Sequence, residues 1–264
     1  MEIVRCQKHH PVSYEVVHLN GSEYIDLGAK EYGAGSGWQN RVLSYGKKRI
    51  HIFKRINTDE IKILAAKLGG ISENFRPYES VKWTVSFEPL PNLKILCLLV
   101  EDEEFGTDFF VYFNRRSAEI VPAEDTIIFA TVFICLLAQE AEFLWTKKQK
   151  RLGSKILEKQ PIDQKKINVV QQIQPDVAEK VASNLGGEFY KKSEGWSITF
   201  KPISEFPVTY TVTSTEVQMR FDEEKAQWMP GVVYAFKWLY LNAIIREARK
   251  FSDDLPQISF SGLI

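Results

Sequence analysis

Two stretches of the chain resemble each other in the same order, and this repeat constrains the fold more than any other feature. The matching segments are residues 66–70 (AKLGG) with 183–187 (SNLGG), 83–90 (WTVSFEPL) with 196–203 (WSITFKPI), and 113–122 with 221–230. Collinear self-similarity of this kind is typical of a duplicated structural unit. The sequence therefore predicts two diverged copies of one unit of about 80 residues.

Each copy shows the same expected order of elements. A short helix comes first, and a Gly-Gly pair ends it because glycine adopts the left-handed conformation without a Cβ clash. Trp83, Val85 and Phe87 then alternate along a strand, so their side chains share one face. One or two further strands and a long helix follow. The expected helices span residues 58–68 and 123–145 in the first copy, and 175–185 and 231–251 in the second.

Residues before the first copy begin with a hairpin signal. Asn20-Gly21 lies between two runs of strand-forming residues, and this dipeptide suits a type I′ turn. Arg49–Ile56 is expected to be another strand. The fold class is therefore predicted as α+β, an internal duplication of a helix–β-meander–helix unit with pseudo-twofold packing, preceded by an N-terminal β-hairpin segment. The expected divisions are a β-rich segment (1–56), the first repeat unit (57–145), a basic linker (146–174) and the second repeat unit (175–264).

Composition narrows the class of protein. The 34 basic and 34 acidic residues give a formal net charge of zero, which argues against a dedicated nucleic-acid binder. The N-terminus has no apolar signal region. The apolar run Thr126–Ala138 is too short to cross a bilayer, which takes about 20 residues, so we expect a buried core helix and no membrane association. Three widely spaced cysteines favour a reducing, cytoplasmic setting.

An acidic run in the first copy is the main candidate site. Asp102, Glu103, Glu104 and Phe105 follow an apolar strand, so they are expected at a strand end or hairpin tip. The second copy has no equivalent run. Together with Glu124 and Asp125 at the start of the following helix, they could bind a basic partner, a polar ligand or a hard cation. The alternative is a solvated turn whose charges keep edge strands apart.

A second candidate site lies at the N-terminus. Cys6, His9 and His10 are ligand types that suit zinc or another transition metal, although no further pair completes a set of four. Surface histidines on a frayed terminus are the alternative. Gly33–Gly37 lacks the spacing of a dinucleotide loop or a P-loop. The six tryptophans could line a ligand pocket or belong to the core (Trp38, Trp83, Trp145, Trp196, Trp228 and Trp238).

Residues 66–142 resemble a family catalogued as a domain of unknown function, numbered three-seven-eight-six, from anaerobic bacteria and archaea. The resemblance is carried by Leu68-Gly69-Gly70, Leu90-Pro91, Asp102–Phe105, Phe113-Asn114, Ser117-Ala118 and Pro122–Asp125, with a fainter copy at residues 183–251. Glu101 and Asn114 stand where the family has Gly and Asp. The family has no assigned reaction. The resemblance implies an accessory role near corrinoid or metalloenzyme metabolism.

These features support three hypotheses about function. The preferred one is a non-catalytic accessory protein that binds a protein partner or small ligand through the acidic run. The second is a metal-binding protein or an enzyme that uses carboxylates or the N-terminal Cys and His residues. The third is a structural subunit of a larger complex. The sequence identifies no cofactor, and no nucleophile–base motif is recognisable in it.

Overall fold

The computed structural model describes residues 16–19, 22–33, 36–77, 79–152 and 163–257, and these residues form two compact units. The first unit contains most of the described residues up to Trp145, and the second contains those from Thr146 on together with Lys67–Gly69 and Pro89–Pro91. Each unit combines α-helices with one antiparallel sheet. The fold is therefore α+β, as the sequence predicts.

The sheet of the first unit has six strands in the order β1-β2-β6-β5-β4-β3. The strands are β1 (Val16–Leu19), β2 (Ser22–Ile25), β3 (Ile71–Glu73), β4 (Val81–Leu90), β5 (Leu93–Asp102) and β6 (Gly106–Asn114). The pairing of Val16 with Ile25 and of Leu19 with Ser22 confirms the expected N-terminal hairpin. Strand β2 then pairs with β6, which attaches this hairpin to the edge of the β3–β6 meander.

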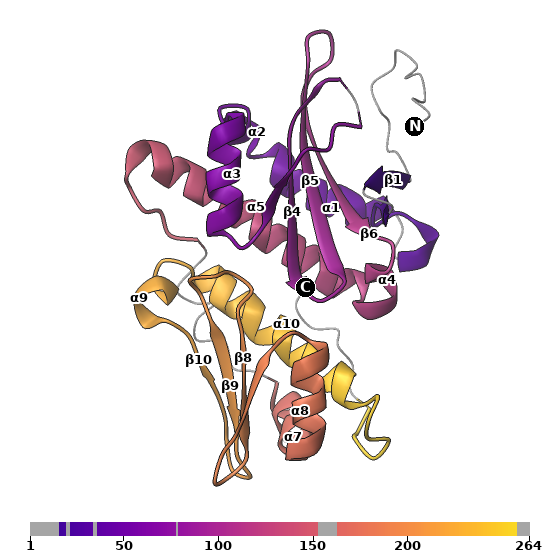
Figure 1. Cartoon of the computed structure of the whole chain (residues 1–264), viewed down its shortest axis with the longest axis vertical. Helices are drawn as coiled ribbons and strands as arrows, with labels where there is room; N and C mark the ends of the chain where they lie inside the picture. The colour runs from indigo at the N-terminus through magenta and orange to yellow at the C-terminus, as the bar shows by residue number, and fades with distance from the viewer. Residues whose placement is uncertain (1–15, 20–21, 34–35, 78, 153–162, 258–264) are drawn as a thin grey trace. The chain divides into compact units, whose positions relative to one another are not determined.

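Helices cover one face of this sheet (Figure 1). They are η1 (Lys30–Tyr32), α1 (Ser36–Lys47), α2 (Ile50–Phe53), α3 (Thr58–Lys67), α4 (Ser117–Ile120) and α5 (Ala123–Thr146). Two aromatic stacks join helices to strands. The rings of Phe53 and Phe109 lie 5.0 Å apart, and those of Phe87 and Phe133 lie 4.5 Å apart. These contacts place the main apolar layer between the sheet on one side and helices α2 and α5 on the other.

The other face of the sheet carries a second apolar cluster, here called the outer cluster. Its buried members are Leu19, Tyr24, Val81, Leu96, Leu98, Val100, Phe110 and Tyr112. Successive side chains of a strand point to opposite faces, so Leu96, Leu98 and Val100 of β5 belong to this cluster, whereas the odd-numbered residues between them point to the helical side. Phe75, in the loop after β3, packs against the outer cluster. The sheet is therefore buried on both faces.

The expectation of a strand at Arg49–Ile56 was wrong. Residues Ile50–Phe53 form the helical turn α2, and its carbonyls and amides bond locally instead of to a neighbouring strand. Ile52 and Phe53 are buried next to each other, a pairing that a helical turn allows and an alternating strand does not. Residues 36–47, also in the segment expected to be β-rich, form α1.

Helix α5 is the expected core helix. It is long and apolar enough to cross a membrane by length and composition alone, but 61% of its most apolar window is buried inside the structure. Phe129, Phe133 and Leu137 are almost completely buried. This burial accounts for the apolar run without a bilayer.

The second unit has a sheet of four strands in the order β10-β9-β8-β7. Its elements are α7 (Gln164–Gln171), α8 (Pro175–Asn184), β7 (Glu188–Lys191), β8 (Trp196–Phe200), β9 (Val208–Val212), β10 (Val217–Arg220), α9 (Glu223–Ala226) and α10 (Pro230–Ala248). Stacking of Phe200 on Tyr240, with centroids 4.6 Å apart, joins the sheet to α10.

Part of the segment expected to be a solvated basic linker is ordered in this unit. Lys166 lies on α7 and is only 1% exposed. Its Nζ donates a hydrogen bond of 2.8 Å to Asn242 Oδ1 and lies 4.4 Å from the centroid of the Trp238 ring. A buried ammonium needs such contacts because burial removes its hydration. Lys166 therefore belongs to the core of the second unit and not to a solvated linker.

Both units follow one order of elements: a helix, four antiparallel strands, a short helix and a long helix. The sequence predicts the first helix, the later strands and the long helix. It predicts neither the first strand of each meander, β3 and β7, nor the short helices α4 and α9, all of which have only three or four residues. The common order is what a duplication would leave. The duplication itself and the pseudo-twofold packing stay predictions.

Candidate functional site

The acidic run forms the turn between β5 and β6, as expected. Asp102 Oδ1 accepts hydrogen bonds from the backbone N–H groups of Glu104 and Phe105, at 2.9 and 3.0 Å, and Gly106 closes the turn with a φ of 81°. Glu103, Glu104 and Phe105 are exposed. One of the three carboxylates thus holds the turn together. Binding of a partner at this acidic turn stays a prediction that rests on Glu103, Glu104 and Phe105.

Glu124 and Asp125 do not join the acidic turn. They lie at the start of α5, which follows the end of β6, whereas the turn lies at the other end of the β5–β6 hairpin (Figure 1). A strand of this length places the two groups roughly 30 Å apart. Asp125 is only 3% exposed. The structure therefore separates the two parts of the expected site.

The expected metal ligands Cys6, His9 and His10 lie outside the described residues. Among the residues that the structure describes, no group of three or more His, Cys, Asp or Glu side chains is placed to hold a metal ion. Burial raises the pKa of the Cys97 thiol, and it raises the pKa of the Cys135 thiol despite the opposing charge of Arg49. Both thiols are therefore held protonated, which makes them poor nucleophiles and metal ligands.

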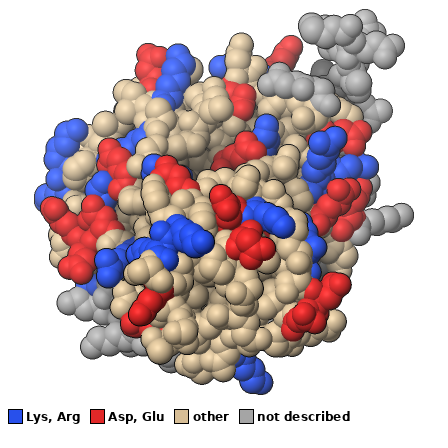
Figure 2. Space-filling view, turned by 60° about the horizontal axis from the view of Figure 1, so that its bottom comes forward, with Lys and Arg blue, Asp and Glu red and all other residues tan. Residues whose placement is uncertain are grey.

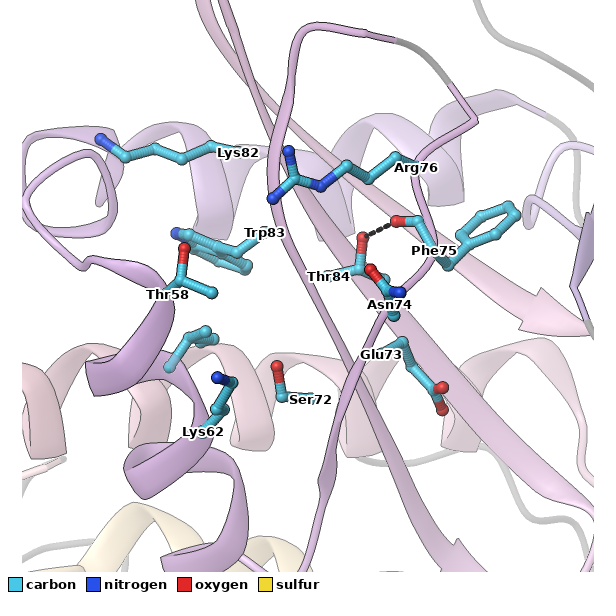
Figure 3. A pocket seen from close by; sticks show the side chains of 11 residues that line it. Thr58, Lys62, Ser72, Glu73, Asn74, Phe75, Arg76, Lys82, Trp83 and Thr84 are labelled. Carbon is cyan, nitrogen blue, oxygen red and sulfur yellow. Dashed lines mark hydrogen bonds between the residues drawn. The ribbon is translucent and has the colours of Figure 1, made fainter.

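The structure places a different set of residues around a pocket of about 220 Å³ in the first unit (Figure 3). The pocket lies between the start of α3 and the edge formed by β3 and β4. Its lining residues are Thr58, Ile61, Lys62, Ser72, Glu73, Asn74, Phe75, Arg76, Lys82, Trp83 and Thr84. Three hydroxyl and three cationic side chains are among them, and the nearly buried ring of Trp83 forms the floor.

The start of α3 is fixed by a capping box. Asn57 Oδ1 accepts hydrogen bonds from the backbone N–H groups of Asp59 and Glu60, at 3.0 and 2.9 Å, and Glu60 Oε2 accepts from Asn57 N at 2.9 Å. The other carboxylate oxygen of Glu60 accepts from the indole N–H of Trp145 on α5 at 2.8 Å. These bonds hold Thr58, the first residue of α3, at the pocket wall.

Arg76 is the cation that the surrounding structure presents to the pocket. The preceding residue, Phe75, is held twice: its ring packs on the outer cluster, and its carbonyl accepts a 2.7 Å hydrogen bond from Thr84 Oγ1. The side chain of Arg76 extends from this anchored loop toward Trp83, whereas Glu73 and Phe75 point away (Figure 3). Within the described part of the chain, no ion pair or hydrogen bond engages the Arg76 guanidinium.

The other charged groups of the pocket have partners. Lys82 Nζ lies 2.8 Å from Glu101 Oε2 and also donates to the carbonyl of Lys54, and Lys62 Nζ lies 3.3 Å from Asp59 Oδ1. Glu73 accepts a 2.6 Å hydrogen bond from Ser86 Oγ, and this bond turns its carboxylate out of the pocket. Arg76 is therefore the one cation of the described lining without a partner, and it leaves local positive charge there.

Trp83 forms the most rigid part of the floor. It is 3% exposed, its indole N–H donates to the carbonyl of Phe53 at 3.4 Å, and its ring meets those of Phe53 and Phe109 edge-on. A ring held on three sides keeps one shape whether the pocket is filled or not, so a ligand loses less free energy in ordering its site.

The sequence contains one signal for this pocket, a difference in loop length. Twelve residues separate Gly70 from Trp83, but only eight separate the matching Gly187 from Trp196. The additional residues lie in the loop that carries Phe75 and Arg76. A loop that is longer in one of two units with the same order of elements is a segment that this order does not need.

On the face of the molecule shown in Figure 2, acidic and basic side chains lie in small interspersed groups. This distribution fits the formal net charge of zero. No protein-family model matches the chain, and neither a curated protein nor a solved structure shows significant similarity to it. The resemblance to the domain of unknown function stays a prediction that these comparisons neither confirm nor refute.

Proposed function

We propose that this chain is a binding protein whose first unit holds a small anionic molecule in the pocket between α3 and the β3–β4 edge. One observation carries the proposal: an exposed, unpaired arginine, Arg76, follows the anchored residue Phe75 and extends toward the buried ring of Trp83. A guanidinium recognises oxyanions through parallel N–H groups, and pre-ordering of its backbone raises affinity without new contacts.

The geometry favours binding over catalysis. The titratable groups of the lining are cations and one carboxylate, Glu73, which already accepts a hydrogen bond from Ser86. Acid–base chemistry would need a group poised to exchange a proton near the operating pH. A rigid floor, hydroxyl groups and one free cation suit recognition of a ligand.

The test is nuclear magnetic resonance of the isotope-labelled protein titrated with a panel of small carboxylates and inorganic phosphate. We expect at least one anion to shift the backbone amide signals of the pocket residues, Ser72 to Thr84, in a saturable way. Arg76→Ala should remove that response. The matched control is Arg116→Ala, which removes another exposed arginine from the same unit. A response that survives Arg76→Ala, or that Arg116→Ala also removes, would contradict the proposal.

A further inference from the structure

We infer that the ligand of this pocket is a small monocarboxylate that carries a hydroxyl or similar hydrogen-bonding group at its far end. The inference rests on the proposed function, since it names the class of anion that the pocket takes. Three features of the lining lead to it: its charge, the placement of its hydrogen-bonding groups and its size.

The charge of the lining favours one negative charge over two. Lys62 and Lys82 are each paired with a carboxylate, so Arg76 supplies a single unpaired positive charge. Glu73 lines the same wall, but its carboxylate is turned out of the pocket by its bond to Ser86. A dianion such as phosphate or a dicarboxylate would therefore find no second unpaired cation among the described lining residues.

The hydrogen-bonding groups of the lining favour a planar carboxylate. A guanidinium presents two parallel N–H groups that match the two oxygens of a carboxylate. Phosphate sites at helix starts use free backbone N–H groups. At the start of α3, however, the N–H groups of Asp59 and Glu60 already donate to Asn57. The helix start therefore offers a hydroxyl, that of Thr58, in place of an anion site.

Two hydroxyl groups face the end of the pocket away from Arg76. Thr58 comes from α3 and Ser72 from β3, and both side chains lie below Trp83 in the view of Figure 3. A hydroxyl both donates and accepts, so the two can bond a ligand hydroxyl or carbonyl. A molecule without the polar group would not form these bonds and should therefore bind less tightly.

The size of the pocket limits the ligand to a few atoms. A volume of about 220 Å³ corresponds to roughly seven molecules of liquid water, at about 30 Å³ each. A hydroxy acid of about four carbons is smaller than this volume and fits within it. Its carbon atoms would lie near the ring of Trp83, which is 3% exposed.

The deciding experiment compares four probes on the whole chain by the same amide signals: 3-hydroxybutyrate, butyrate, malonate and inorganic phosphate. 3-Hydroxybutyrate and malonate are of similar size but differ in charge, and butyrate lacks only the hydroxyl. We expect 3-hydroxybutyrate to bind most tightly. Arg76→Ala should weaken it by roughly tenfold or more, as loss of a charged hydrogen bond does, and Arg76→Lys should recover only part of that loss.

A second variant tests the far end of the pocket. Thr58→Val combined with Ser72→Ala should weaken 3-hydroxybutyrate to the level of butyrate and leave butyrate itself unchanged. Equal loss for both probes would contradict the role of the hydroxyl groups. Thermal unfolding of each variant, compared with Arg116→Ala, shows whether the fold is intact.

The outcomes separate the two proposals. If malonate or phosphate binds more tightly than the monocarboxylates and depends on Arg76, the ligand class is wrong and anion binding stands. If none of the four probes shifts the pocket signals, or if the shifts do not depend on Arg76, both the ligand class and the proposed function are overturned.

Discussion

The two units share an order of elements but differ in the lengths of their strands and loops. Strands β5 and β6 of the first unit pair over eight residues on each side, from Ile95–Phe113 to Asp102–Gly106, whereas β9 and β10 pair over four. The first unit also has the longer loop between its first two strands. The acidic turn and the arginine of the pocket both lie in these extensions, so both candidate sites fall in the additional length of the first unit.

The framework beneath these extensions is the same in both units. Trp83 and Trp196 are 3% and 1% exposed, and each donates its indole N–H to a carbonyl shortly before the first helix, Phe53 O at 3.4 Å and Ile173 O at 3.0 Å. A buried indole needs this partner. The comparison teaches that the tryptophans belong to the scaffold and that the loops above them carry what is specific.

The largest expected loss of stability follows substitution of the two scaffold tryptophans. Trp83→Ala and Trp196→Ala should each lower the free energy of unfolding by about 3–5 kcal/mol, because each leaves a large cavity and an unpaired carbonyl. Urea unfolding followed by circular dichroism measures the loss. If one substitution costs less than about 1 kcal/mol, the two tryptophans do not play equivalent roles.

The next largest difference in stability is expected between alanine substitutions at two turn glycines, one in each unit. A Cβ at Gly195, where φ is 92°, would lie 1.9 Å from the carbonyl oxygen of Val212, whereas a Cβ at Gly106, where φ is 81°, would meet open space. Gly106→Ala should cost about 1–2 kcal/mol from backbone strain alone. Gly195→Ala should cost more, since it adds a clash with backbone. Equal losses of stability in urea would contradict the difference in packing.

A smaller difference between the units is expected in the ionisation of their buried tyrosines. Burial, with the charges of Glu73 and Glu88, raises the pKa of Tyr24 to about 12, and burial raises the pKa values of Tyr210 and Tyr240 well above their ordinary range. A raised tyrosine pKa stabilises the fold below about pH 10, and this stability is lost as the pH rises toward the folded pKa.

The free energy of unfolding should fall between about pH 10 and 12. In Tyr24→Phe this fall should be smaller by about 1–2 kcal/mol. Urea midpoints across that range measure the effect. In the same range the absorbance of tyrosinate should show ionisation that depends on Tyr24, while Tyr210 and Tyr240 stay protonated in the folded protein. An unchanged pH dependence in Tyr24→Phe would show that burial does not hold this hydroxyl neutral.

The smallest effects are expected at the acidic turn. Asp102→Ala removes the acceptor of two backbone N–H groups and should cost about 1 kcal/mol, whereas Glu103→Gln with Glu104→Gln should change stability by less than about 0.5 kcal/mol. The glutamine pair is therefore the variant in which to test partner binding at the turn. Thermal unfolding checks both, and a larger loss in the glutamine pair would mean that these carboxylates are structural.

Sequence patterns predicted the parts of the fold that depend on local chemistry. The Gly-Gly helix ends, the alternating strands after them and the Asn-Gly hairpin all follow from backbone preferences of nearby residues. Residues 49–56 were misjudged because a short apolar run fits a strand or a helical turn equally well. Strands β3 and β7 were missed because their pairing with β4 and β8 defines them more than their own residues do.

The candidate site was less accessible to sequence reasoning. Thr58, Ser72, Arg76 and Trp83 come from a helix, a strand, a loop and a second strand, and only the tertiary structure brings them together. Lys166 shows the same limit, since it lies in a segment rich in lysine while its contacts, Trp238 and Asn242, lie more than 70 positions away. Local composition describes such residues as surface groups.

The connection of β2 to β6 has a consequence for how this sheet is assembled. Strands β4, β5 and β6 follow one another in the chain, so they can pair through short loop closures. The contact between Ile25 and Phe113 closes a loop of 88 residues, and closing a longer loop costs more chain entropy. Contacts between distant residues also slow folding. We therefore expect the meander to form first and the N-terminal hairpin to add to its edge last.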